Sequence, residues 1–421
     1  MDAPKTGPAP APGTDGLEQT VRSLAPLSRL PTSEGEREAA ELIRRRFEAA
    51  GCRTRVERES AFPSYAVPIG LLSAGAAVAG LLAGRGKRTS RREAAAGRRA
   101  VGVLAGAAAV WGIVDDITGG RLLARRALVR ARTTQNVIAE TGDPEADHTL
   151  VVLVHHDAAP SGVVFQQHLE RWLVTRHPGV AERLDSNPPL WWPVIAGPAL
   201  VALGSARDAD PLRRLGVALS ALSAAALGDI ASRPAVPGAN DNLSGVAAAV
   251  AVAEALRADP VPGLRVTFVS AGAEEALQQG VLAYARRHFG RLAKDRTWFL
   301  TLDTVGSGTL VMLEGEGPVR MHDYGGRFKD LVADCAHRAG VPLRRGLRSR
   351  NSTDGSVPHR HGFPTVTVVS VDDRKLIPNY HLPSDTPDNV DYTCVANAAR
   401  LTEAVARRLA TAQALRRDGS A

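Results

Sequence analysis

Short apolar runs recur along this chain, and several of them end in acidic or histidine residues. Five runs have the length and content of buried strands, at 134–140, 148–157, 264–275, 297–306 and 363–371. Helical stretches separate them, as at 244–257, 277–289 and 326–340. Strands that alternate with helices predict a central mixed, mostly parallel sheet with helices on both faces. The expected fold is a three-layer α/β/α domain.

The N-terminal part has a different character. Residues 1–16 contain four prolines and no apolar stretch, so they predict a disordered tail and not a cleavable signal. A helical pattern runs from Leu17 to Gly51, and the next residues, "CRTRVERE", alternate as a strand does. The three cysteines are scattered without CxxC spacing, which favours buried small side chains over a disulfide framework or a thiolate metal site.

Two pairs of apolar segments interrupt the α/β pattern. The segments are 64–84 with 100–114, and 190–206 with 215–230. A membrane span needs about 20 apolar residues, with about 17 as the lower limit, so the first segment qualifies and the others are borderline. We expect two inserted apolar helical hairpins. They can pack on each other or on a second subunit, but the lack of a polar stripe favours membrane insertion.

The positive charge of the chain is concentrated beside these segments. The net charge is +8, yet residues 85–99 and 121–132 together hold +11, which leaves about −3 elsewhere. This local excess favours anionic membrane lipid as a partner and not nucleic acid. The positive-inside rule places 85–99 and 207–214 in the cytoplasm and the α/β domain outside, although the five arginines of 121–132 oppose this orientation. A soluble cytoplasmic protein is the alternative.

Histidines and acids at the strand ends are the candidate functional residues. His155 and Asp157 end one strand, and at i and i+2 they point to the same side, so Asp157 can orient the His155 ring. Asp241, in "GANDNLSG", precedes a helix and is either an N-cap or a ligand. Taken singly, each of these residues fits an ordinary loop or cap.

Taken together, they predict a metal centre. The carboxyl ends of parallel strands meet at one edge of a sheet, where crowded acids repel one another unless cations are present. Two histidines and three carboxylates without cysteine suit a pair of Zn²⁺ ions. The five candidate ligands are His155, Asp241, Glu275, Asp303 and His381.

The chain resembles the M28 zinc peptidases, the aminopeptidase Y and glutamate carboxypeptidase group. The resemblance rests on five segments that occur in the family's order: "HHD", "GANDNLSG", "AEEA", "LDTVG" and "YHLPSDTPDN". It implies a dizinc metallo-exopeptidase that hydrolyses peptides, most simply as an aminopeptidase.

The resemblance also implies a role for each residue. His155 and Asp303 would bind one zinc, Glu275 and His381 the other, and Asp241 would bridge them. Glu274 would be the general base that takes a proton from a metal-bridging water, whose pKa falls to about 7, and Asp157 would assist His155.

Two departures from the family pattern are visible. The interval from His155 to Asp241 is long, because the second hairpin lies within it, and the first hairpin falls between the first two strands. Both hairpins are thus expected on one side of the domain. In the family's Ser-Asp-His segment, here "NSTDGS", Asp354 fits but Gly355 replaces the histidine. This departure concerns the substrate pocket and not the metal pair.

Alternative functions remain on the same sequence. A glutaminyl-cyclase-like acyltransferase shares much of the ligand set, and a noncatalytic membrane scaffold would keep the fold without needing Glu274. Arg348 and Arg350 leave a carboxypeptidase open, because they can bind a substrate carboxylate. No oligomeric state is predicted.

The predicted division of the chain is a tail at 1–16, a catalytic domain of 17–63, 118–189 and 231–415, and hairpins at 64–117 and 190–230.

Overall fold

An eight-stranded sheet organises the domain. The computed structural model describes residues 13–84 and 92–418. The strand order is β1-β2-β4-β3-β5-β10-β6-β9, with parallel pairing of β4 to β3, β3 to β5 and β5 to β10 at the centre. The strands are β1 (Arg53–Ala61), β2 (Arg132–Gly142), β3 (Thr149–His155), β4 (Arg265–Ala271), β5 (Thr297–Leu302), β6 (Thr309–Met312), β9 (Leu343–Arg344) and β10 (Thr365–Val371). A separate pair is formed by β7 (Gly315–Glu316) and β8 (His322–Asp323).

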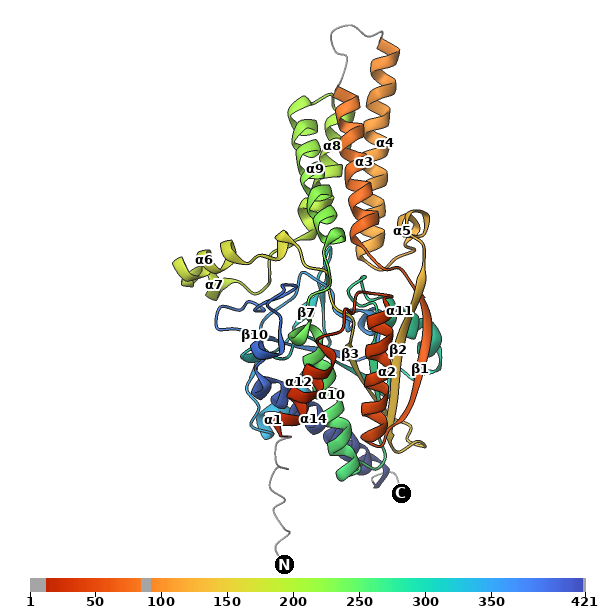
Figure 1. The fold of residues 1–421 in the computed structure, drawn as a ribbon, viewed down its shortest axis with the longest axis vertical. Helices are drawn as coiled ribbons and strands as arrows, with labels where there is room; N and C mark the ends of the chain where they lie inside the picture. The colour runs from red at the N-terminus through yellow and green to blue at the C-terminus, as the bar shows by residue number, and fades with distance from the viewer. Residues whose placement is uncertain (1–12, 85–91, 419–421) are drawn as a thin grey trace, which may run out of the picture.

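Helices cover both faces of this sheet (Figure 1). One core contains residues of α1 (Thr14–Leu24), α2 (Glu34–Ala49), α10 (Ser244–Ala258), α12 (Gly326–Arg338) and α14 (Tyr392–Asp418). The other contains residues of α11 (Gln279–His288) and α13 (Ser356–Arg360). Alternate side chains of β3 enter opposite cores, Val152 the first and Val151 the second, as a strand buried on both faces requires. The predicted three-layer α/β/α fold with a mixed, mostly parallel sheet is confirmed.

The N-terminal helical pattern divides into two helices. The first begins at Thr14, three residues before the predicted start, so 14–16 are helical and not part of a disordered tail. Residues 1–12 of that predicted tail lie outside the described residues. The second helix begins after Ser33, whose side chain accepts the N–H of Glu36 as an N-cap. All three cysteines are buried and free, as expected.

The four apolar helices form one bundle that projects from the domain (Figure 1). They are α3 (Ala66–Gly84), α4 (Arg92–Ile117), α8 (Trp191–Ala206) and α9 (Asp210–Ser232). Small residues allow the helices to approach closely. A Cβ on Gly106 would lie 2.7 Å from the carbonyl oxygen of Pro198, and one on Gly216 would lie 2.5 Å from the backbone nitrogen of Val201. The two hairpins therefore lie on one side of the domain.

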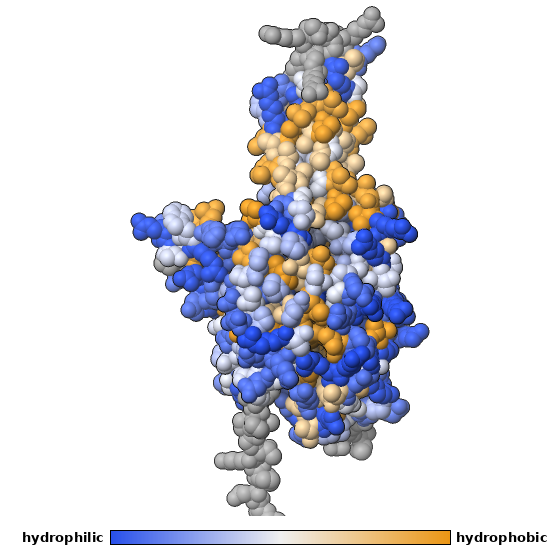
Figure 2. All heavy atoms as spheres, viewed as in Figure 1, coloured by the Kyte–Doolittle hydropathy of each residue, from blue (hydrophilic) through white to orange (hydrophobic). Residues whose placement is uncertain are grey.

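The outer surface of the bundle is apolar. Figure 2 shows a hydrophobic band along its middle and hydrophilic residues toward its far end. The exposed side chains include Leu71, Val78, Leu104, Trp111 and Leu222. Three of the helices, α3, α4 and α9, are long and apolar enough to cross a membrane, whereas α8 has 16 residues. The predicted apolar segment 100–114 is shorter than α4, because the helix continues through charged residues at both ends.

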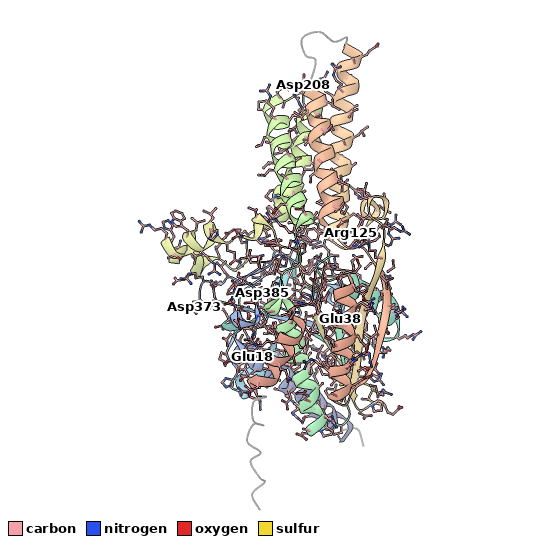
Figure 3. All side chains as sticks on the ribbon, viewed as in Figure 1. Glu18, Glu38, Arg125, Asp208, Asp373 and Asp385 are labelled. Atoms are coloured by element: carbon pink, nitrogen blue, oxygen red, sulfur yellow. The ribbon has the colours of Figure 1, made fainter. Side chains whose placement is uncertain are left out.

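A buried ion pair joins the bundle to the domain. Arg125, on the short helix α5 (Leu123–Leu128), is fully buried and lies at the junction in Figure 3. It makes a bidentate contact with Asp116 of α4, with Nε 3.0 Å from Oδ2, and it also donates to the carbonyl oxygen of Ala276. Ala276 directly follows Glu275. The pair thus links the end of a bundle helix to the loop that carries two of the site residues.

We predict that Arg125→Met lowers the free energy of unfolding by about 3–5 kcal/mol, because it leaves the Asp116 carboxylate buried and unpaired. The double variant with Asp116→Leu should recover much of that loss. Denaturant unfolding of the full chain in detergent measures both. Arg126→Met, at the exposed neighbouring position, is the matched control and should change the value by less than about 0.5 kcal/mol. Equal losses for Arg125→Met and Arg126→Met would contradict the assignment.

Candidate metal centre

The sheet brings the predicted site residues to one edge. His155 ends β3, Glu274 and Glu275 follow β4, and Asp303 follows β5. Asp241 lies just before α10, and His381 comes from the loop after β10. A cavity of about 350 Å³ is lined by all of these residues except His155. His155 contacts Asp241, which does line the cavity. The convergence expected from parallel strands is observed.

The Asp241 carboxylate faces two sets of partners. Its Oδ1 is 3.3 Å from Nε2 of His155, and its Oδ2 is 3.2 Å from Nε2 of His381. His381 Nε2 is also 3.2 Å from Oε2 of Glu275. Two ligands bound tetrahedrally to one ion at about 2.0–2.1 Å lie about 3.3 Å apart, so these separations fit metal ligands. Ligand atoms of His155, Asp241 and Glu275 all lie within 4.8 Å of one another.

The loop before α10 leaves the Asp241 side chain free of any capping role. Asn242, one residue later, accepts the N–H groups of Gly245 at 3.1 Å and Thr304 at 3.1 Å. It is Asn242, and not Asp241, that serves the helix start. The backbone N–H groups of Asn240 and Asp241 donate to the two oxygens of Asp385, at 2.8 and 3.1 Å. The loop is therefore held by its backbone while the Asp241 carboxylate points to the histidines.

Asp157 positions the two glutamates. Its oxygens accept the N–H of Glu274 at 3.0 Å and that of Glu275 at 2.9 Å. Its distance to Nδ1 of His155 is 3.5 Å, at the long limit for a hydrogen bond. The Glu274 side chain accepts a hydrogen bond from Nε2 of Gln278 at 3.1 Å. Asp157 thus acts mainly on the backbone of the glutamate loop, whereas sequence reasoning assigned it to the His155 ring.

Three buried residues that support the site were not identified as site residues in the sequence analysis. Arg29 donates to backbone oxygens of His156 and Pro237, each at 2.8 Å, and so joins the end of β3 to the Asp241 loop. Glu36 accepts the N–H of Ala273, one residue before Glu274, at 2.8 Å. Asp385 is the third. It belongs to "PSDTPDN", and the Asp of the quoted family segment was the one available hint.

The electrostatics of the site follow from burial. Burial raises the pKa of Glu274 well above its usual range, although the charge of His155 opposes this shift. Burial also raises the pKa of Asp303 to about 7. For His381, burial lowers the pKa, but Glu275 and Asp241 outweigh it and raise the value to about 10. The buried carboxyl groups have too few positive charges beside them, and divalent cations would relieve this imbalance.

The departure at Gly355 has a steric cause. A Cβ at this position would lie 2.3 Å from Oγ1 of Thr367, 2.9 Å from Oγ1 of Thr301 and 3.1 Å from the hydroxyl of Tyr324. Side chains that fill this space thus exclude a histidine. Asp354, beside it, is buried with both carboxylate oxygens lacking a hydrogen-bond donor.

An inserted segment reaches His381, one of the predicted metal ligands. Phe165 belongs to the chain between β3 and the second hairpin, and its ring lies edge-on to His381 with centroids 4.5 Å apart. The Tyr380 ring also stacks on the His381 ring, with centroids 3.9 Å apart. Tyr65, at the base of α3, packs edge-on against Trp191, at the base of α8. The segment between β3 and α8, from Val164 to Leu190, therefore walls the cavity on one side.

Comparisons with known proteins agree on the fold. Residues 227–406 match the model of peptidase family M28. An aminopeptidase from Aneurinibacillus sp. strain AM-1 is 16% identical over 93% of each chain, with a TM-score of 0.52. A zinc aminopeptidase from Bacillus subtilis is 15% identical over 94% of this chain and 95% of its own, with a TM-score of 0.54.

A third structure, the glutaminyl cyclase of Bacteroides thetaiotaomicron bound to N-acetylhistamine, is 14% identical over 94% of this chain and 99% of its own, with a TM-score of 0.53. No curated protein matches the chain in sequence. At these identities the solved structures establish the fold, and the family model covers four of the five predicted ligands. The match of residues 227–406 to peptidase family M28, within a fold shared with solved aminopeptidases, supports a hydrolase.

Proposed function

We propose that this metallopeptidase is a dizinc aminopeptidase. The observation that carries the proposal is the Asp241 carboxylate, with His155 on one oxygen and the pair His381 and Glu275 on the other. That arrangement suits a carboxylate that bridges two ions. Asp303, in the same cavity, would complete the set on the His155 side. The zinc aminopeptidase of Bacillus subtilis supports zinc as the metal.

The reaction divides between the metals and the protein. When bound, the two ions would acidify a water molecule and polarise the peptide carbonyl. Glu274 is held beside the proposed ligands by Gln278, and burial raises the pKa of its carboxyl well above the usual range, which makes the carboxylate a better proton acceptor. It would accept the proton of the attacking water at a carboxylate oxygen. It would then deliver that proton to the leaving amine as the C–N bond breaks.

The contacts of Arg348 and Arg350 favour an aminopeptidase over a carboxypeptidase. Arg348 lies 2.9 Å from a carboxylate oxygen of Asp323 and 3.3 Å from one of Asp185. Arg350 lies over the ring of Trp192, 5.6 Å from its centroid. Both side chains are engaged within the protein, which supports a substrate bound through its amino end.

The bundle would anchor this domain in a membrane. Its apolar surface and its three helices of spanning length support insertion. The far tip carries arginines, and there Arg99 pairs with Asp208, which is labelled at the tip in Figure 3. By the positive-inside rule the tip would be cytoplasmic and the catalytic domain would lie outside.

We expect the full chain to hydrolyse aminoacyl-nitroanilides after zinc is added to the metal-free protein, with two zinc ions bound per chain. Glu274→Gln should keep both ions but lower kcat by about 100- to 10,000-fold, because it removes the proton acceptor. Glu275→Gln, the adjacent matched variant, should instead lose bound zinc. Metal analysis and initial rates measure the two effects. Zinc-loaded protein that releases ammonia from N-terminal glutamine but hydrolyses no nitroanilide would identify a cyclase and contradict the proposal.

We also expect Asp385→Asn to weaken zinc binding by about 10- to 100-fold. An amide offers one acceptor oxygen where the carboxylate holds two backbone N–H groups, so the Asp241 loop would lose its fixed position. Competition with a chromogenic chelator measures the affinity. Asp388→Asn, an exposed change in the same loop, is the control. Unchanged affinity in Asp385→Asn would show that Asp385 does not position the ligand.

A further inference from the structure

The segment between β3 and α8 forms an arm beside the base of the bundle. It contains α6 (His168–Arg176) and α7 (Pro178–Arg183). Figure 1 shows this arm projecting sideways at the level where the bundle meets the domain. If the bundle crosses a membrane, the arm lies at the height of the membrane surface. Its chemistry can therefore be compared with what that surface requires.

One face of α6 is apolar and exposed. Leu169, Trp172 and Leu173 follow the i, i+3, i+4 spacing of a single helix face, and their exposed fractions are 64%, 60% and 44%. Figure 2 shows hydrophobic atoms on the edge of the arm nearest the bundle. Tryptophan and leucine on one face of a short helix are typical of segments that lie in the lipid headgroup region.

Basic residues adjoin this face. Trp172 and Thr175 line a shallow hollow of about 430 Å³ together with Arg171, Arg176 and Arg374. Arg171 is 3.8 Å from Asp372, which partly offsets its charge, so Arg176 and Arg374 provide most of the positive potential. A tryptophan with arginines around it complements an anionic phosphate headgroup above acyl chains. The surface therefore favours a lipid bilayer as its occupant.

The neighbouring face of the same helix lines the cavity of the proposed metal site. Glu170, Val174 and Leu173, which lies at the border of the two faces, line that cavity with Phe165, which contacts His381. Apolar residues Leu313, Val371 and Ile377 line it from the catalytic domain. The arm thus carries the proposed lipid surface and part of the cavity wall on neighbouring faces of one helix.

We propose that the arm rests on the outer surface of an anionic bilayer and that the cavity takes peptides bound to that surface. The proposal depends on the dizinc aminopeptidase assignment above and adds its substrate class: peptides with a free amino terminus and an apolar or lipid-anchored remainder. A substrate confined to the surface meets the cavity at a high effective concentration. The apolar lining suits the side chains such peptides carry.

The position of the arm can be measured directly. A fluorophore attached at Trp172→Cys in the full chain, reconstituted into vesicles of phosphatidylcholine with phosphatidylglycerol, should be quenched by lipids that carry nitroxide near the headgroup. The three native cysteines are buried and should not react. The same label at Glu38→Cys, an exposed site on α2, should not be quenched. A label at 172 that stays unquenched, or that reports close pairs of chains, would overturn the proposal.

Substrate preference provides the second test. One peptide is compared as a free peptide and with a C-terminal acyl anchor in the same vesicles. The double variant Leu169→Ser and Trp172→Ser should lower kcat/KM for the anchored peptide by about tenfold and leave a soluble aminoacyl-nitroanilide unchanged. Val319→Ser, another exposed apolar position, is the control. If the unsubstituted protein does not hydrolyse the nitroanilide, the peptidase assignment is refuted. If it hydrolyses the nitroanilide but has equal kcat/KM values for the free and the anchored peptide, only the role of the arm is refuted.

Discussion

The structure depends on carboxylates that are buried close together at one edge of the sheet. Such groups repel one another and resist desolvation, so the fold must hold each of them in place even without a bound cation. The chain achieves this through backbone N–H groups: Asp157 holds the glutamate loop, and Asp385 holds the Asp241 loop. Arg29, fully buried, joins the end of β3 beside Asp157 to the Asp241 loop. The acids that support the site are thus satisfied by the backbone, which leaves the others available for a metal.

Much of this arrangement was predictable from local sequence. The strand patterns are short apolar runs, and parallel strands bring their ends together, so the meeting of His155, Glu275 and Asp303 at one edge followed from periodicity and topology. The helix after Asp241 was equally clear. The detailed role of Asp157 was not, because its partners are backbone groups more than 100 residues away, and backbone groups leave no mark on a sequence pattern.

Other features needed three dimensions for a similar reason. Arg29 and Glu36 lie in an ordinary amphipathic region, and nothing local separates them from the solvated charges around them. The arm was missed because α6 has nine residues, too few for a periodic signal amid polar neighbours. Gly355 showed only as a departure from a family pattern, and its cause is a hydroxyl cluster built from three separate segments.

The way in which the bundle joins the domain has a mechanical consequence. The two hairpins leave and re-enter at four points, at the bases of α3, α4, α8 and α9, and one of these is locked by the Arg125–Asp116 pair. A domain on a single flexible linker could swing and sample many heights, but one held at four points cannot. The metal centre would stay at a constant distance from the bilayer. Since each extended residue spans about 3.3–3.6 Å, that distance would set how many residues a membrane-tethered peptide must extend to reach the proposed metal centre.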